Sequence, residues 1–155
     1  MLPVGAPAVA SRLVLQPSAQ KLNASEKLKR DREVLLEAVK KNGRELEHAS
    51  EELKGDKGVV MEAVKQAGSS LQYASEELKG DKGVVMEAVK QSGLALRLVA
   101  SEELKGDREV VKEAVKQNEG ALEHASEELK GDRDVMLEAV RTAFIMQSKA
   151  ARNVR

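Results

Sequence analysis

Residues 56–80 read DKGVVMEAVKQAGSSLQYASEELKG, and units of the same pattern follow one another along most of the chain. The first residue of each unit is an aspartate, and the five aspartates are separated by 25, 25, 26 and 25 residues: Asp31, Asp56, Asp81, Asp107 and Asp132. Residues 49–66 and 74–91 are identical. A fixed period of roughly 20 to 50 residues is typical of repeat architectures, in which each unit is one supersecondary motif.

The first half of each unit predicts an amphipathic helix. In residues 31–43 the apolar residues recur at helical spacing: Val34, Leu35, Ala38 and Val39. Asp31 can accept hydrogen bonds from the free N–H groups of the first turn. Gly43 can adopt the left-handed conformation that often ends a helix. We therefore expect one helix from each aspartate to the glycine twelve residues later.

The second half predicts a return helix over residues 44–54. Leu46, Ala49 and Leu53 share one face, and Gly55 precedes the next aspartate. Ser50, followed by two glutamates, is an alternative helix cap that would divide this helix in two. Because linkers of one or two residues force successive helices to fold back, we expect an all-α, solenoid-like array of short antiparallel two-helix repeats. A half unit at 24–31 precedes four full units and a long last helix.

Two irregularities interrupt the pattern. The third unit holds one extra residue between Leu96 and Ser101. Because an added residue rotates a helical face by about 100°, we expect a bulge or local unwinding there. In the fourth unit Glu119 replaces the glycine that ends the first helix, and Gly120 follows it, which predicts a first helix one residue longer.

Composition limits the kinds of function. The chain of 155 residues is 41% hydrophobic but 1% aromatic, which indicates a thin core of Val, Leu, Ala and Met. It contains no cysteine, which excludes disulfides, thiol nucleophiles and cysteine-ligated metals. The net charge is zero, but residues 31–140 hold 17 bases against 25 acids between two basic ends. Such an acidic body argues against nucleic-acid binding along the array.

The chain divides into a leader, an array and a tail. We expect a flexible leader at 1–20, the helical repeat array at 21–140, and a basic extension of the last helix at 141–155. The leader contains all three prolines and no acid, so an organelle address there is an alternative to an untargeted intracellular protein. No apolar run approaches the roughly 20 residues of a membrane-spanning helix.

The repeat as a whole resembles a known family. The consensus Asp-[Arg/Lys]-Glu-Val-Val-x-x-Ala-Val-Lys-Gln-x-Gly-x-x-Leu-x-x-Ala-Ser-Glu-Glu-Leu is similar to short repeats catalogued as a domain of unknown function, found in algae, other protists and some bacteria. The resemblance covers about residues 24–140 and implies a helical repeat array, with no catalytic residue, cofactor or substrate to transfer. Gly58 and Gly83 depart from the usual glutamate of the first turn.

The residue types that carry chemistry recur in every unit, which argues against an active site. His48 and His124 occupy equivalent places about three units apart, so we interpret them as half-buried packing residues and expect no metal site. Paired glutamates occur four times, whereas a catalytic carboxylate pair is unique and lies in a pocket. The glycine-rich junctions lack the spacing of a phosphate-binding loop. We therefore expect no enzyme, no cofactor and no small-molecule substrate.

Two sets of residues are candidates for a protein-interaction surface. The first is an apolar row along the array, with packing in a second layer as the alternative: Leu36, Met61, Met86 and Leu137. The second lies in the last helix and is either a cap that seals the array or a basic docking helix: Arg141, Phe144, Ile145, Lys149 and Arg152.

The repetition, the charge distribution and the lack of a unique constellation favour a non-enzymatic interaction module or scaffold whose partner is a protein. A structural subunit attached to a larger assembly through its basic ends is one alternative. An accessory domain of an enzyme is another. The sequence does not specify an oligomeric state.

Overall fold

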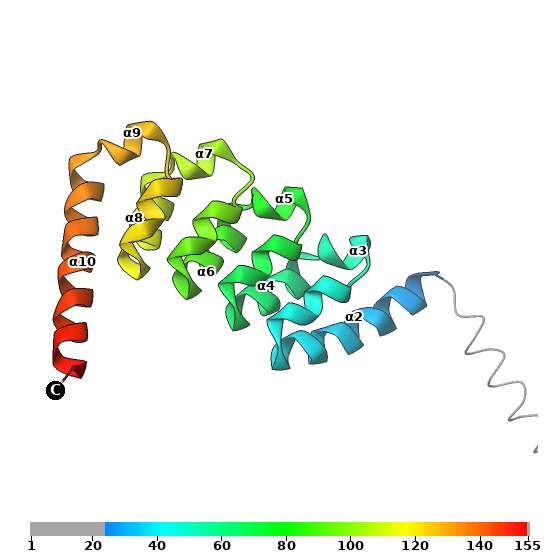
Figure 1. The fold of residues 1–155 in the computed structure, drawn as a ribbon. Helices are drawn as coiled ribbons and strands as arrows, with labels where there is room; N and C mark the ends of the chain where they lie inside the picture. The colour runs from blue at the N-terminus through cyan, green and yellow to red at the C-terminus, as the bar shows by residue number, and fades with distance from the viewer. Residues whose placement is uncertain (1–23, 155) are drawn as a thin grey trace, which may run out of the picture. The chain divides into compact units, whose positions relative to one another are not determined.

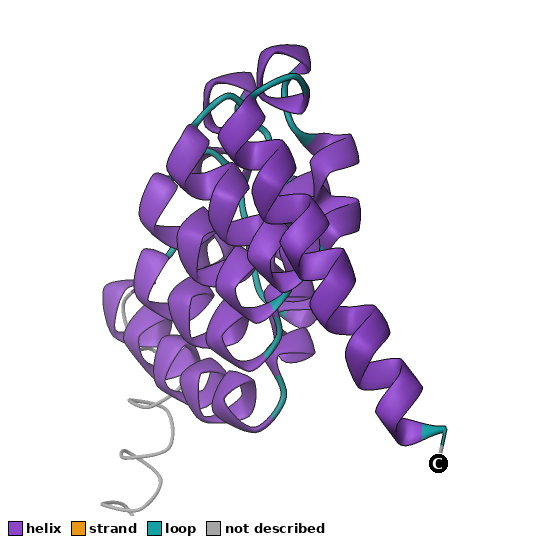
Figure 2. Cartoon of the chain, turned by 90° about the vertical axis from the view of Figure 1, so that its left-hand side faces the viewer, coloured by secondary structure: helices purple, strands orange, loops and turns teal. Residues whose placement is uncertain are grey.

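The computed structural model describes residues 24–154, and every element in this range is a helix (Figure 2). The leader predicted at 1–20 lies outside the described residues. The chain divides into two units between Val34 and Leu35, and the described helices that begin after residue 42 lie in the second. Helix α2 (Ala24–Lys41) begins in the first unit and ends in the second.

The first half of each later repeat is an α-helix that begins directly after the aspartate, as predicted. We call these the A helices: α4 (Lys57–Gln66), α6 (Lys82–Gln91), α8 (Arg108–Gln117) and the start of α10 (Arg133–Asn153). The Asp56 carboxylate accepts a hydrogen bond from the Val59 backbone N–H at 3.0 Å, and the same bond recurs after Asp81, Asp107 and Asp132. The free N–H groups of each first turn are thereby satisfied.

The second half of each repeat is two short helices. A 3₁₀ helix comes first: η1 (Gly43–His48), η2 (Gly68–Tyr73), η3 (Gly93–Leu98) and η4 (Glu119–His124). One α-turn follows: α3 (Glu51–Lys54), α5 (Glu76–Lys79), α7 (Glu102–Lys105) and α9 (Glu127–Lys130). Ser50 accepts a hydrogen bond from the Leu53 N–H at 3.3 Å. The division at this serine, which the sequence offered as an alternative, is confirmed.

Within residues 35–155 the helices pack in sequence order, which makes the array solenoid-like (Figure 1). Neighbouring A helices lie side by side from α4 to α10 and form one layer. The 3₁₀ helices form the second layer: η2 and η3 each pack against the A helix before them, the A helix after them and the next 3₁₀ helix, and η4 packs against α8 and α10. The fully buried apolar side chains are valines, leucines and alanines, including Leu46, Leu71 and Leu96.

The glycine that follows the first helix in the first three repeats, Gly43, Gly68 and Gly93, has a different role from the predicted one. No described glycine has a positive φ, so Gly43 does not end its helix in the left-handed conformation. It is instead the first residue of η1 and is buried, and a Cβ on it would lie 2.4 Å from the Ala63 carbonyl oxygen. Gly68 and Gly93 approach the next A helix in the same way. The glycine therefore permits close contact between consecutive repeats.

Two predicted helix boundaries are wrong. Asp31 does not cap a helix, because α2 runs without a break from Ala24 and joins the predicted half unit to the first A helix. Arg30 stands in α2 where the later repeats have a glycine before their aspartate. Helix α8 ends at Gln117 and, like α4 and α6, is ten residues long, so Glu119 does not lengthen it.

The extra residue of the third repeat lies in a linker. Helix η3 is six residues long, as η2 is, and the insertion is taken up at Val99 and Ala100 before α7. The Ala100 N–H donates to the Lys79 carbonyl at 3.2 Å, a bond that Ser75 makes to Lys54 in the preceding repeat. The local unwinding expected here is thus confined to the linker, and the helical faces keep their register.

Ser70 in η2 carries the one buried side-chain hydroxyl without a hydrogen-bond partner among the described residues. The third and fourth repeats place buried alanines, Ala95 and Ala121, at the equivalent position. Because an unsatisfied buried hydroxyl costs free energy, Ser70→Ala should raise the free energy of unfolding by about 1 kcal/mol. Urea denaturation tests this, with the partly exposed Ser69→Ala as control; an equal or lower midpoint for Ser70→Ala contradicts it.

Candidate interaction face on α10

Each A helix has two apolar edges that face opposite neighbours. The third and seventh residues after the repeat aspartate, which we call the preceding-side positions, are Val135 and Ala139 in α10 and are buried. The fourth and eighth residues, the following-side positions, are Val111 and Val115 in α8, and both are fully buried. All four positions are fully buried in α4, α6 and α8.

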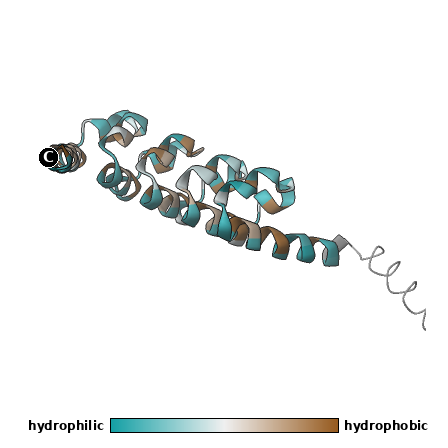
Figure 3. Cartoon of the chain, turned by 60° about the horizontal axis from the view of Figure 1, so that its bottom comes forward, coloured by the Kyte–Doolittle hydropathy of each residue, from teal (hydrophilic) through white to brown (hydrophobic). Residues whose placement is uncertain are grey.

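The following-side positions of α10 are exposed. Met136 is 48% and Val140 is 67% exposed, although the equivalent valines of α8 have no exposure. Leu137 and Phe144, at 55% and 69% exposure, continue the same side of the helix because residues three, four and seven apart lie close together on it. We call these four residues, Met136, Leu137, Val140 and Phe144, the α10 outer face. Figure 3 shows apolar and polar residues together on α10, which is seen nearly end-on.

Sequence reasoning found only half of this face. Leu137 and Phe144 were candidates, whereas Met136 and Val140 were not, because both hold places of the apolar stripe that recurs in every first helix. The positions of Met136 and Val140 within the repeat could have identified them. Following-side positions are buried by the next repeat, so those of the last described repeat are left exposed.

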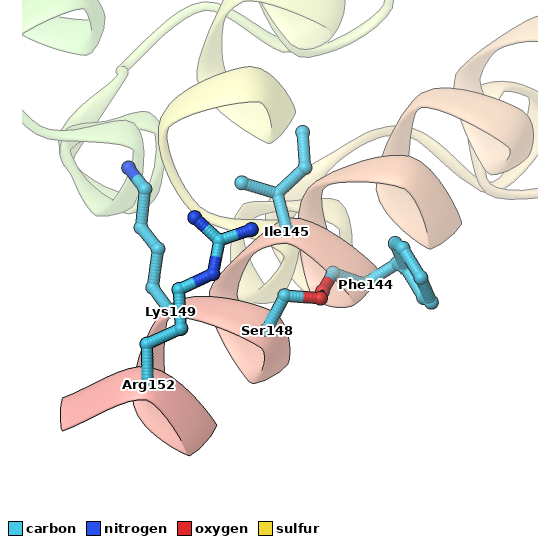
Figure 4. Close-up of a pocket in the computed structure, with 5 residues that line it drawn as sticks. All are labelled: Phe144, Ile145, Ser148, Lys149 and Arg152. Atoms are coloured by element: carbon cyan, nitrogen blue, oxygen red, sulfur yellow. The ribbon is translucent and has the colours of Figure 1, made fainter. Parts of the chain in front are cut away.

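The remaining candidates of the last helix lie beside the outer face. Arg141, Ile145, Lys149 and Arg152 are all exposed. A shallow depression of about 200 Å³ is lined by Phe144, Ile145, Ser148, Lys149 and Arg152 (Figure 4). All five lining residues come from α10 alone, so this depression is a feature of one helix surface. It places apolar and cationic side chains next to each other.

The predicted apolar row along the array is not uniformly exposed. Leu36, Met61 and Met86 are partly buried and pack against the core, whereas Leu137 is exposed. Lys112 occupies the same place in α8 and is partly buried. The row therefore offers its full apolar surface only at α10.

Consecutive repeats are also joined by ion pairs between the A-helix starts. The first residue after each aspartate pairs with the aspartate of the next repeat: Lys57 with Asp81 at 2.8 Å, Lys82 with Asp107 at 2.8 Å, and Arg108 with Asp132. We call this series the inter-repeat ladder. The hydrogen bond from Lys57 is the largest of the effects that lower the pKa of Asp81, and Lys82 acts likewise on the pKa of Asp107.

The ladder stops at the end of the array. Arg133 holds the next cationic position and is exposed, and no residue in the described part of the chain forms an ion pair with it. Backbone N–H donation from Val135 is the largest cause of the lowered pKa of Asp132, and Arg108 contributes as well. The last repeat thus presents an unpaired cation at the start of the helix that carries the apolar outer face.

The residues considered for chemistry lie apart on the surface. His48 is exposed and His124 partly buried, so the interpretation of both as half-buried packing residues is wrong for His48. The first glutamate of each pair forms an ion pair with the lysine three residues later, as in Glu51 with Lys54 at 3.1 Å. Residues 24–154 contain no group of three His, Cys, Asp or Glu that could hold a metal. None of the helices described is long and apolar enough to cross a membrane.

Fold and surface together define a tandem helical-repeat protein. The chain belongs to the family described as domain of unknown function DUF4116, whose profile matches residues 22–54, 56–105, 81–129 and 107–146. The resemblance noted from the repeat consensus is thereby confirmed, as is the all-α, solenoid-like fold class. No curated protein and no solved structure matches the chain.

Proposed function

We propose that this protein is a non-enzymatic interaction module that binds a protein partner through the α10 outer face. The observation that carries the proposal is the exposure of Met136 and Val140, at positions where α4, α6 and α8 have fully buried valines. A partner that covers these side chains removes apolar surface from water, which is the main driving force of most protein association.

The composition of the face supports a helical partner. Its apolar residues recur at three- and four-residue spacing, and a partner helix with the same spacing can interdigitate with them. Terminal repeats of a solenoid usually have a polar outer surface that keeps them soluble. The α10 outer face departs from this rule, which is typical of a binding surface.

The basic residues beside the face favour the second candidate, a subunit attached to a larger assembly. Arg141, Lys149 and Arg152 lie along one stretch of α10, and no acid follows Glu138 in the chain. An acidic partner surface would be attracted to this stretch, and the attraction would weaken with added salt. In this candidate the outer face and the basic stretch act together.

Affinity capture with matched baits tests the proposal. The full chain and Val140→Glu serve as baits, each captured protein is then purified, and its affinity is measured by calorimetry. We expect Val140→Glu to weaken binding at least about tenfold, because it places a charge in an apolar contact. The control Leu94→Glu makes the same kind of change at an apolar residue that is 40% exposed on η3.

The control variant should bind as the unchanged chain does. Equal affinity of the chain and of Val140→Glu for every purified partner would show that the α10 outer face is not the binding surface. A loss of binding caused by Leu94→Glu alone would place the surface on the 3₁₀ layer and would overturn the proposal as well. Circular dichroism of each variant establishes that the helices are intact.

A further inference from the structure

We infer that the α10 outer face binds the α2 helix of a second copy of this chain, so that the arrays of two molecules stack head to tail. The inference rests on the proposed function and names its partner. The second copy would supply the preceding-side edge that the following-side edge of α10 lacks.

The structure contains three examples of the proposed contact. The pairs α4 with α6, α6 with α8 and α8 with α10 pack side by side, and the same ion pair of the inter-repeat ladder joins each pair. In each pair the following-side residues of one A helix are fully buried. An interface that forms three times within the chain is a direct template for a fourth formed between molecules.

The apolar counterpart is present on α2. Val34 and Ala38 hold the preceding-side positions of the first repeat, as Val135 and Ala139 do in α10. Val34 is 67% exposed, although every other preceding-side valine is fully buried. Val140 at the other end of the array is also 67% exposed. One edge of each kind is therefore left exposed, and the two kinds are those that pair within the array.

The charges match in the same register. Each rung of the inter-repeat ladder joins a cation to the aspartate of the next repeat, and Arg133 is the next cation in the series. In a head-to-tail contact the next repeat aspartate is Asp31 of the second copy, and Asp31 is exposed. This ion pair would fix the register of the contact that the apolar residues stabilise.

The two edges differ, so the contact is heterologous and does not close on itself in a pair. Association through different surfaces at the two ends continues into longer assemblies unless the rotation closes a ring. We therefore expect sedimentation velocity of the full chain, from about 1 µM to about 200 µM, to show an average mass that rises beyond that of a dimer, as for a contact of micromolar strength.

Two single substitutions test the two edges separately. Val140→Glu blocks the following-side edge and Val34→Glu blocks the preceding-side edge, and the two valines are equally exposed. Each variant alone should sediment as a monomer, because every contact needs one edge of each kind. An equimolar mixture should form a complex of two chains and no larger species. Val140→Glu keeps an unchanged preceding-side edge and Val34→Glu keeps an unchanged following-side edge, so only one contact can form.

The sedimentation results distinguish α2 of a second copy from other partners of the α10 outer face. Dimers of Val34→Glu alone would show that α10 pairs with α10 of another copy, and would overturn the inference while leaving the proposed function in place. A monomeric full chain over the whole concentration range would overturn it too, whereas the capture experiment above reports on the face independently. The charge reversal Arg133→Asp should weaken association, and mixing it with Asp31→Arg should restore a two-chain complex at least in part.

Discussion

Gly93→Ala is expected to lower the free energy of unfolding by about 2 to 3 kcal/mol, as overpacking of a tightly packed interior does. A Cβ on this residue would lie 2.1 Å from the Ala114 carbonyl oxygen, and the Ala114 carbonyl carbon and Asn118 nitrogen lie about an ångström farther away, at 3.1 Å. All three neighbours are backbone atoms, so no side-chain rotation relieves the clash. An alanine fits at this position only if η3 and α8 move apart. Urea denaturation measures the loss.

Gly131→Ala is the matched control. This glycine is exposed and precedes an A helix, and a Cβ there would meet nothing closer than the Glu128 carbonyl oxygen at 3.7 Å. Its free energy of unfolding should change by less than about 0.5 kcal/mol, as for surface substitutions in general. If the two variants lose the same stability, close approach between repeats is not the reason for the glycine.

Leu96→Ala is expected to cost about 2 to 5 kcal/mol, the range for removing a buried leucine side chain. Leu96 has no exposed surface and is among the largest fully buried side chains of the described core. The buried residues of this core are valines, leucines and alanines, and their small side chains fill the cavity poorly. We expect a lower urea midpoint with little change in the slope of the transition.

The comparison for this variant lies two residues away in the same 3₁₀ helix. Leu94 is 40% exposed, so Leu94→Ala should lower the free energy of unfolding by less than about 1 kcal/mol. A similar loss in both variants would mean that the effect reflects the helical propensity of η3 and not the core between the layers.

Much of the fold follows from local rules that the sequence displays. The aspartates predicted helix starts at four of five places, because Asp81 and its equivalents cap a first turn through one side-chain bond. The period predicted packing between consecutive units. The break before Glu51 was one of two readings, since Ser50 is a good cap but the return segment is short enough to be one helix.

The errors arose where tertiary contacts decide. The glycine after the A helix looked like a helix stop, but its lack of a side chain serves a contact with the next repeat, which no local pattern reveals. The boundary before Asp31 was missed because the repeat alignment outweighed Arg30, a helix-compatible residue at the place of a glycine. The insertion near Ala100 stayed outside the helices because the linker there can lengthen.

The sequence indicated an exposed apolar surface on the last helix, but it identified only some of the residues that form it. Phe144 was found because it is larger than the residues of the other first helices, and Leu137 because it belongs to the apolar row along the array. Met136 and Val140 look like core residues in every repeat, and only their place in the last described repeat makes them exposed. Exposure of such positions depends on which neighbour is present, and this is a property of the array and not of the unit.

The sequential packing of α4, α6, α8 and α10 also shapes how the molecule folds. Each of these helices is held by neighbours close in sequence, so few long chain loops must close before stabilising contacts form, and folding should be fast for a chain of this length. In such arrays opening begins where a unit has only one neighbour. Backbone amides of α10 should therefore exchange with solvent sooner than those of α6, and a molecule docked on the outer face would slow that exchange.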